Sequence, residues 1–154
     1  MIEITIPSHK QLRLEHAVFD VNGTLALDGE LLPGVKLLLD QLRQQVQVHL
    51  LTADTHGKQA AIDTELGLKA HIITRGAAQK ADYVRELGAA KVVAIGNGAN
   101  DVKMCEIAGL SIAILGPEGV AGELVRTADV LVRSIDDALE LLLHPQRVRA
   151  TLRR

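Results

Sequence analysis

Short apolar runs alternate with helical patterns along almost the whole chain. Six runs rich in Val, Ile, Leu and Ala predict strands over residues 16–19, 46–51, 71–73, 92–95, 111–115 and 130–132. The segments between them predict helices over residues 35–45, 58–66, 78–87, 101–108, 119–126 and 135–143. Strands that are apolar on both faces are typical of a parallel sheet covered by helices. The pattern therefore predicts an α/β fold, a three-layer sandwich around a Rossmann-like parallel sheet.

The two ends of the chain depart from this rhythm. Residues 2–6 alternate between apolar and polar positions and precede a Pro-Ser-His-Lys turn, which predicts a short antiparallel edge hairpin over residues 1–14. Residues 144–154 contain four arginines and are expected to form a solvated C-terminal tail. No Pro-, Gly- or Ser-rich linker divides the sequence, so we expect one domain over residues 1–154.

Composition narrows the class of protein. Aromatic residues make up 1% of the chain and tryptophan is absent, which excludes the aromatic stacking usual in single-strand nucleic-acid binding. The net charge of −2 gives no general attraction to nucleic acid or anionic membranes. A single cysteine excludes an internal disulfide, and no signal peptide or spanning apolar run is recognisable. We therefore expect a cytoplasmic protein with neither nucleic acid nor membrane as partner.

Small polar residues follow three of the predicted strands. Asp20 and the turn at 21–24 come after the first strand, residues 52–55 after the second, and residues 96–101 after the fourth. Ligands of parallel sheets bind at the carboxyl ends of the strands. These residues are therefore the candidate site.

The residue types at these positions suit phosphoryl transfer. Asp20 would be ionised at neutral pH and could act as a nucleophile without a base. Thr52 would donate a hydroxyl, Lys80 would supply a fixed positive charge, and Asp101 would add a carboxylate for Mg²⁺. Backbone N–H groups of the turn after Asp20 would also bind phosphate: Val21, Gly23 and Thr24.

The same residues, in the same order, resemble the four motifs of the haloacid dehalogenase (HAD) superfamily. The matching stretches are FDVNGTL at 19–25, LT at 51–52, Lys80, and GNGAND at 96–101. Within that superfamily, LLTAD at 50–54 and KADYVREL at 80–87 look like the phosphorylation domain of P-type ATPases and the small soluble phosphatases related to it. The resemblance implies a Mg²⁺-dependent phosphohydrolase that acts through an aspartyl-phosphate on Asp20, with Thr52, Ala53 and Lys80 binding the phosphoryl group.

Two positions depart from the superfamily's pattern. Its phosphatases carry an aspartate as general acid and base two residues after the nucleophile, where this chain has Asn22. An amide cannot transfer a proton, so we expect slow turnover. Asn97 stands where the superfamily usually has a metal-binding aspartate. The metal ligands that the resemblance implies are Asp20, the main-chain carbonyl of Asn22, Asp101 and, more weakly, Asn97.

Both departures favour one alternative, a non-hydrolytic regulatory or scaffold protein with a degenerate HAD site. A two-component receiver, which also uses Asp, Thr and Lys, does not fit, because its acidic cluster precedes the phosphorylated aspartate.

The spacing between the motifs predicts that there is no cap domain. Residues 25–51 hold a short hairpin with its tip at 28–29 and one helix, and residues 53–79 hold one helix and one strand. HAD members without a cap act on large substrates or close the site with a neighbouring subunit. The partners we expect are a small phosphorylated substrate and a second copy of the chain that closes the site.

Overall fold

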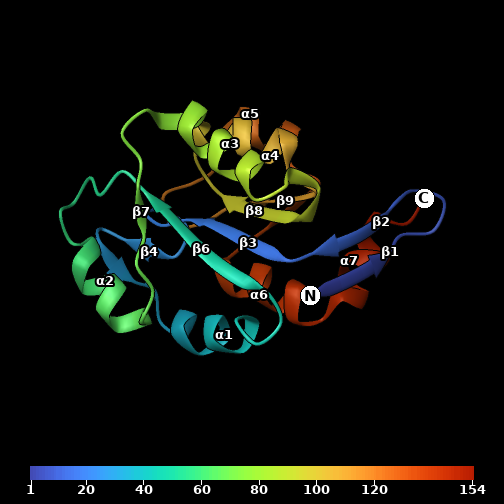
Figure 1. Cartoon of the computed structure of the whole chain (residues 1–154), viewed down its shortest axis with the longest axis horizontal. Coiled ribbons are helices and arrows are strands. Elements are labelled where there is room, and N and C mark those ends of the chain that lie inside the picture. The colour runs from blue at the N-terminus through green and yellow to red at the C-terminus, as the bar shows by residue number, and fades with distance from the viewer.

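The computed structural model describes all 154 residues, with a central sheet of six parallel strands between two layers of helices (Figure 1). The strands run in the order β10-β9-β8-β3-β6-β7. Their bounds are β3 His16–Asp20, β6 Gln47–Thr52, β7 His71–Ile72, β8 Val92–Gly96, β9 Leu110–Ile114 and β10 Val130–Val132. The predicted α/β sandwich with a Rossmann-like parallel sheet is confirmed.

Helices cover both faces of this sheet. One face carries α3 (Gly76–Glu86), α4 (Val102–Ile107) and α5 (Gly122–Thr127). The other carries α1 (Val35–Leu42), α2 (Gln59–Leu66) and α6 (Ile135–Leu143). A short 3-10 helix, η1 (Ala89–Lys91), leads into β8, and another, η2 (Ala99–Asp101), precedes α4.

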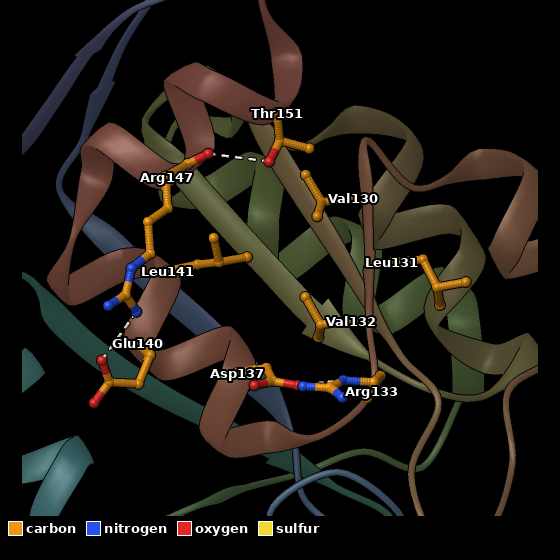
Figure 2. A pocket seen from close by; sticks show the side chains of 9 residues that line it. All are labelled: Val130, Leu131, Val132, Arg133, Asp137, Glu140, Leu141, Arg147 and Thr151. Carbon is orange, nitrogen blue, oxygen red and sulfur yellow. Dashed lines mark hydrogen bonds and ion pairs between the residues drawn. The ribbon is translucent and has the colours of Figure 1, made fainter.

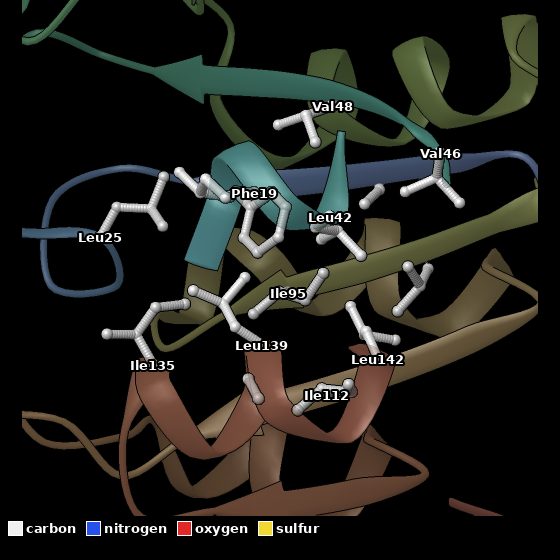
Figure 3. Close-up of a cluster of buried hydrophobic side chains, with 14 of the residues drawn as sticks. Phe19, Leu25, Leu42, Val46, Val48, Ile95, Ile112, Ile135, Leu139 and Leu142 are labelled. Atoms are coloured by element: carbon white, nitrogen blue, oxygen red, sulfur yellow. The ribbon is translucent and has the colours of Figure 1, made fainter. Parts of the chain in front are cut away.

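The central strands are apolar on both faces because each face packs against a helix layer. In β3, Phe19 belongs to the larger core cluster and its neighbour Val18 to the smaller one, and both are fully buried. Figure 3 shows the larger cluster, in which Phe19 and Ile95 of the sheet lie next to Leu42 of α1 and Leu139 of α6. Alternate residues of one strand thus fill two different cores.

Two small hairpins lie outside the main sheet. β1 (Ile2–Thr5) and β2 (Gln11–Leu14) pair antiparallel and form a sheet of their own. β4 (Ala26–Leu27) and β5 (Glu30–Leu31) are joined by a two-residue turn. In that turn Asp28 has φ 51° and Gly29 has φ 79°, the positive values that suit a tight hairpin.

The C-terminal residues contradict the expectation of a solvated tail. Residues Pro145–Leu152 form helix α7, which contacts β1. Val148 is fully buried, and Arg147 Nη1 donates to Glu140 Oε2 of α6 at 3.1 Å. Figure 2 shows this ion pair beside a surface hollow next to the edge strand β10. The inner side of this helix has only two apolar anchors, the buried Val148 and the partly buried Leu152, so the arginines dominate the sequence pattern.

No cap domain covers the sheet. The chain between β3 and α1 holds only the hairpin β4–β5, and the chain between β6 and α3 holds only α2 and β7. None of the helices combines the length and apolar character needed to cross a membrane.

A hydrogen-bonded chain of four side chains crosses the sheet face under α3. His16 Nδ1 lies 3.1 Å from His49 Nε2, and His49 Nδ1 lies 2.9 Å from the Tyr83 hydroxyl. That hydroxyl lies 2.8 Å from His71 Nε2. Burial, followed by the nearby charges of His16 and His71, lowers the pKa of His49 to about 4. The folded protein therefore keeps this imidazole neutral.

We expect the protein to lose stability through His49 as the pH falls from 6.5 towards 4. The unfolded chain takes up this proton near pH 6.5 and the folded chain only near pH 4, so the unfolded state binds more protons in between. The lost free energy of unfolding is about 3 kcal/mol. Urea unfolding at pH 7 and pH 4.5 measures it, with exposed His9→Asn as the control. Equal pH dependence in wild type and His49→Asn would contradict this assignment.

Candidate active site

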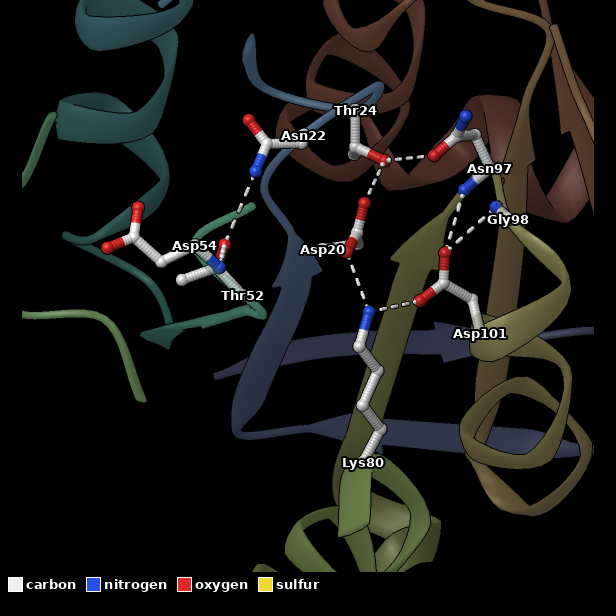
Figure 4. Close-up of polar contacts among 9 residues, drawn as sticks. All are labelled: Asp20, Asn22, Thr24, Thr52, Asp54, Lys80, Asn97, Gly98 and Asp101. Carbon is white, nitrogen blue, oxygen red and sulfur yellow. Dashed lines mark hydrogen bonds and ion pairs between the residues drawn. The ribbon is translucent and has the colours of Figure 1, made fainter. Parts of the chain in front are cut away.

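The polar residues predicted at the strand ends meet at one edge of the sheet, where β3 lies between β8 and β6 (Figure 4). Asp20 ends β3, Thr52 ends β6, and Asn97 directly follows β8. A cavity of about 300 Å³ opens at this edge. Its lining residues are Asp20, Asn22, Thr52, Ala53, Thr55, His56, Asn97, Gly98, Asn100 and Glu118.

Lys80 joins two carboxylates beneath this cavity. Its Nζ donates to Asp20 Oδ1 and to Asp101 Oδ1, both at 2.6 Å, and the Lys80 side chain is only 1% exposed. Burial by itself would lower the pKa of Lys80, but Asp20 and Asp101 outweigh it and raise that pKa. The ammonium therefore stays charged, as the predicted fixed cation should.

The Asp20 carboxylate differs from the prediction in its protonation. Burial and then the nearby Asp101 raise the pKa of Asp20 to about 7, against the opposing effect of Lys80. Asp20 is therefore only partly ionised at pH 7 in the absence of a cation, and not fully ionised as expected from its usual pKa. Its Oδ1 is held by Lys80, whereas Oδ2 accepts only from Thr24 Oγ1 at 3.2 Å. Oδ2 is thus the oxygen left for chemistry.

The Thr52 hydroxyl is prepared to donate. Its Oγ1 accepts from the backbone N–H of Asp54 at 2.9 Å and from Asn22 Nδ2 at 3.4 Å. These contacts use oxygen lone pairs, so the hydroxyl hydrogen is available to an anion in the cavity. Ala53, the next residue, also lines the cavity.

The turn after Asp20 does not direct all its predicted amides at a phosphate. Gly23 N donates to Ala26 O at 2.7 Å and Thr24 N donates to Val21 O at 3.2 Å. The N–H groups of Gly23 and Thr24 are therefore used within the turn, contrary to the prediction. Val21 itself is fully buried in the larger core cluster. Thr24 contributes its side chain instead, because its Oγ1 lies between Asp20 Oδ2 and Asn97 Oδ1.

Asp101 lies behind the cavity and is fully buried. Its Oδ1 accepts from Lys80, and its Oδ2 accepts from the backbone N–H groups of Asn97 at 3.1 Å and Gly98 at 3.0 Å. Both oxygens are thus engaged by the protein. Asp101 positions Lys80 and the turn after β8 in this structure, whereas the sequence had placed it among the metal ligands.

The cavity still offers oxygen atoms that suit a hard divalent cation. Asp20, Asn22 and Asn97 line it, and Asn97 Oδ1 has only the Thr24 hydroxyl as a partner, at 3.3 Å. A Cβ on Gly23 would lie 2.6 Å from Asn97 Nδ2, so glycine keeps this corner open. Carboxylate and amide oxygens are the ligands that Mg²⁺ takes in proteins. The donor chemistry therefore fits the expected cofactor class, a divalent cation.

Two lining residues lie outside the stretches predicted as the candidate site: His56 and Glu118. Glu118 comes from the loop after β9. The rule that ligands collect at strand ends selects this loop as well, because residues 111–115 were predicted as a strand. Applying the rule to every strand would have found it.

Comparison with known proteins gives the class. The family model of haloacid dehalogenase-like hydrolases matches residues 3–109, so the chain belongs to this family of hydrolases. An uncharacterized protein of Methanocaldococcus jannaschii is 43% identical over 63 residues, which cover 41% of this chain and 68% of that protein.

Two solved structures share the fold at low sequence identity. One is 3-deoxy-D-manno-octulosonate 8-phosphate phosphatase of Moraxella catarrhalis, in complex with magnesium, phosphate and KDO. It has a TM-score of 0.67 and 19% identity, over 89% of this chain and 90% of that one. The other is a phospho-aspartyl intermediate analogue of phosphoserine phosphatase, with a TM-score of 0.64 and 18% identity over 84% and 99%. The closer likeness to P-type ATPases stays a prediction.

Proposed function

We propose that this chain is a cytoplasmic, Mg²⁺-dependent phosphohydrolase that acts through an aspartyl-phosphate on Asp20. The observation that carries the proposal is the Asp20 carboxylate in a polar cavity, with one oxygen bound by Lys80 at 2.6 Å and the other facing only Thr24. Membership of a hydrolase family supports it. The substrate would be a small phosphorylated molecule, and a second copy of the chain would close the capless site.

The proposed reaction has two steps. Asp20 Oδ2 attacks phosphorus, a new O–P bond forms, and the bond from phosphorus to the leaving oxygen breaks. Water then attacks the same phosphorus, releases inorganic phosphate and restores the Asp20 carboxylate. The Thr52 hydroxyl donates to a phosphoryl oxygen, and Lys80 keeps its positive charge beside the reacting carboxylate.

The cation would be held by Asp20, the Asn22 carbonyl and Asn97, and would supply charge neutralisation at the phosphoryl oxygens. Asn22 lines the cavity where the family's phosphatases carry a proton-transferring aspartate. Since an amide is neither an acid nor a base near neutral pH, it cannot protonate the leaving oxygen, which departs without help. Slow turnover, with acyl and aryl phosphates preferred over alkyl phosphates, follows from this.

Removing the cation tests the proposal. Hydrolysis of p-nitrophenyl phosphate should fall by about 10²-fold or more in EDTA and recover with excess Mg²⁺, because charge neutralisation contributes several kcal/mol. Acid-quenched protein should also carry a phosphate that hydroxylamine removes, as expected of an acyl phosphate. Turnover that EDTA leaves unchanged, or turnover without a phosphorylated protein, would contradict the proposal.

A further inference from the structure

Only two carboxylates line the cavity, and one of them has no role in the proposed reaction. They are Asp20 and Glu118. Asp101, which the sequence placed among the metal ligands, is fully buried, with both oxygens bonded to protein groups. Glu118 is exposed, lines this polar cavity and makes no side-chain hydrogen bond or ion pair within the chain. It is a free negative charge at a site whose expected cofactor is a cation.

The loop that carries Glu118 is fixed to the site by Asn97. Asn97 Nδ2 donates to Gly119 O at 3.2 Å, and Ala121 N donates to Asn97 O at 2.8 Å. The loop also closes on itself, since Gly119 N donates to Gly116 O at 2.9 Å. Two bonds to one residue therefore hold the loop beside the end of β8.

These contacts bring the Glu118 carboxylate to the corner where Asn97 lies. A Cβ on Gly23 would lie 2.6 Å from Asn97 Nδ2 and would collide with Glu118 Oε2. Both side chains thus border the space that Gly23 leaves open. Any larger residue at position 23 would push the carboxylate away.

The bond to Gly119 also explains why an amide suits position 97. An ionised carboxylate there has no hydrogen to donate, so it would face the Gly119 carbonyl with like partial charge. Asparagine holds the loop, but it removes the negative charge that the family usually places at this position. Glu118 lies on that same loop and supplies one negative charge beside Asn97.

We infer that Glu118 is a ligand of the divalent cation and carries the charge that the family pattern places at position 97. This inference rests on the proposed function, because it concerns the cation of that site. Asp20 and Glu118 together give the one or two carboxylates that Mg²⁺ commonly takes, with Asn97 Oδ1 and the Asn22 carbonyl as neutral donors.

Cation binding to the whole protein, without substrate, tests this directly. Mn²⁺ affinity by electron paramagnetic resonance, with Mg²⁺ as competitor, should fall by about tenfold or more in Glu118→Gln. Glu123→Gln is the matched control, because Glu123 is an exposed glutamate on the neighbouring helix α5 and lines no cavity. Its Mn²⁺ affinity should equal that of the wild type. A Glu118→Gln affinity within twofold of the wild type overturns the inference.

A second variant tests the exchange of charge between the two positions. Adding Asn97→Asp to Glu118→Gln should restore at least part of the Mn²⁺ affinity, because it returns a carboxylate to the same corner. If the double variant binds no better than Glu118→Gln alone, the two positions do not serve one cation and the inference is wrong.

Failure of this inference differs from failure of the proposed function. A wild type that shows Mg²⁺-dependent turnover, with unchanged cation affinity in Glu118→Gln, overturns the ligand assignment alone. A wild type that neither binds Mn²⁺ nor hydrolyses aryl phosphates overturns the proposed function, and the inference with it.

Discussion

Replacing Asp20 with asparagine is expected to reduce phosphate-ester hydrolysis to the uncatalysed background, a loss of at least about 10⁴-fold. An amide oxygen is a poor nucleophile towards phosphorus and forms no aspartyl-phosphate. The fold should survive, because asparagine has nearly the same shape and Lys80 keeps Asp101 as a partner at 2.6 Å. Hydrolysis of p-nitrophenyl phosphate in Mg²⁺ measures the loss, and thermal unfolding checks the fold.

Asp82→Asn is the matched control for this variant. Asp82 is a half-exposed aspartate on the same helix as Lys80, where it pairs with Arg85 at 2.7 Å and lines no cavity. Its rate should equal that of the wild type. If Asp20→Asn keeps a tenth or more of the wild-type rate, the aspartyl-phosphate proposal is wrong.

A silent wild type would favour the other class of function. A regulatory or scaffold protein would keep the fold and bind phosphate or a cation without turnover. Thermal stabilisation of the wild type by Mg²⁺ and phosphate, without product, would be its signature. The buried Lys80–Asp20 pair favours catalysis, because the fold alone does not need a buried lysine beside the proposed nucleophile.

The fold could be predicted because the apolar pattern of most strands and helices indicates which of their faces are buried. Continuous apolar strands such as β3 and β8 face two cores, and that is visible residue by residue. Helix α7 could not be predicted in this way. Its only fully buried residue is Val148, and the helix packs between β1 at the other end of the chain and α6, so local periodicity gave only a weak signal.

The same distinction holds for the site. Topology brings the strand ends together, so Asp20, Thr52 and Asn97 could be found from the strand pattern alone. The direction of each side chain depends on the turn that follows. Helix η2 folds Asp101 back against Gly96, and a Cβ on Gly96 would lie 2.8 Å from the Asp101 Cβ. The Asp101 carboxylate therefore bonds Lys80 and the backbone N–H groups of Asn97 and Gly98 and does not line the cavity. Spacing in the sequence carries no such information.

Changing Asn22 to aspartate is expected to speed the hydrolysis of alkyl phosphates by about 10²- to 10⁴-fold. Asn22 lines the same cavity as Asp20, two residues further along, and its Nδ2 lies 3.4 Å from Thr52 Oγ1. A carboxylic acid at this position can give its proton to the leaving oxygen as the P–O bond breaks. The resulting carboxylate can then take a proton from the water that attacks the aspartyl-phosphate. Asparagine can do neither.

The dependence on the leaving group separates this explanation from a general gain in activity. A phenolate leaves without a proton, whereas an alkoxide needs one, so the wild type should hydrolyse aryl phosphates much faster than alkyl phosphates. Asn22→Asp should narrow that gap, and adding Asp20→Asn should return both rates to background. A rate for alkyl phosphates within threefold of the wild type would contradict the prediction. Proton transfer at position 22 would then not limit the reaction, and the slow step would lie in substrate binding or in the site's affinity for its cation.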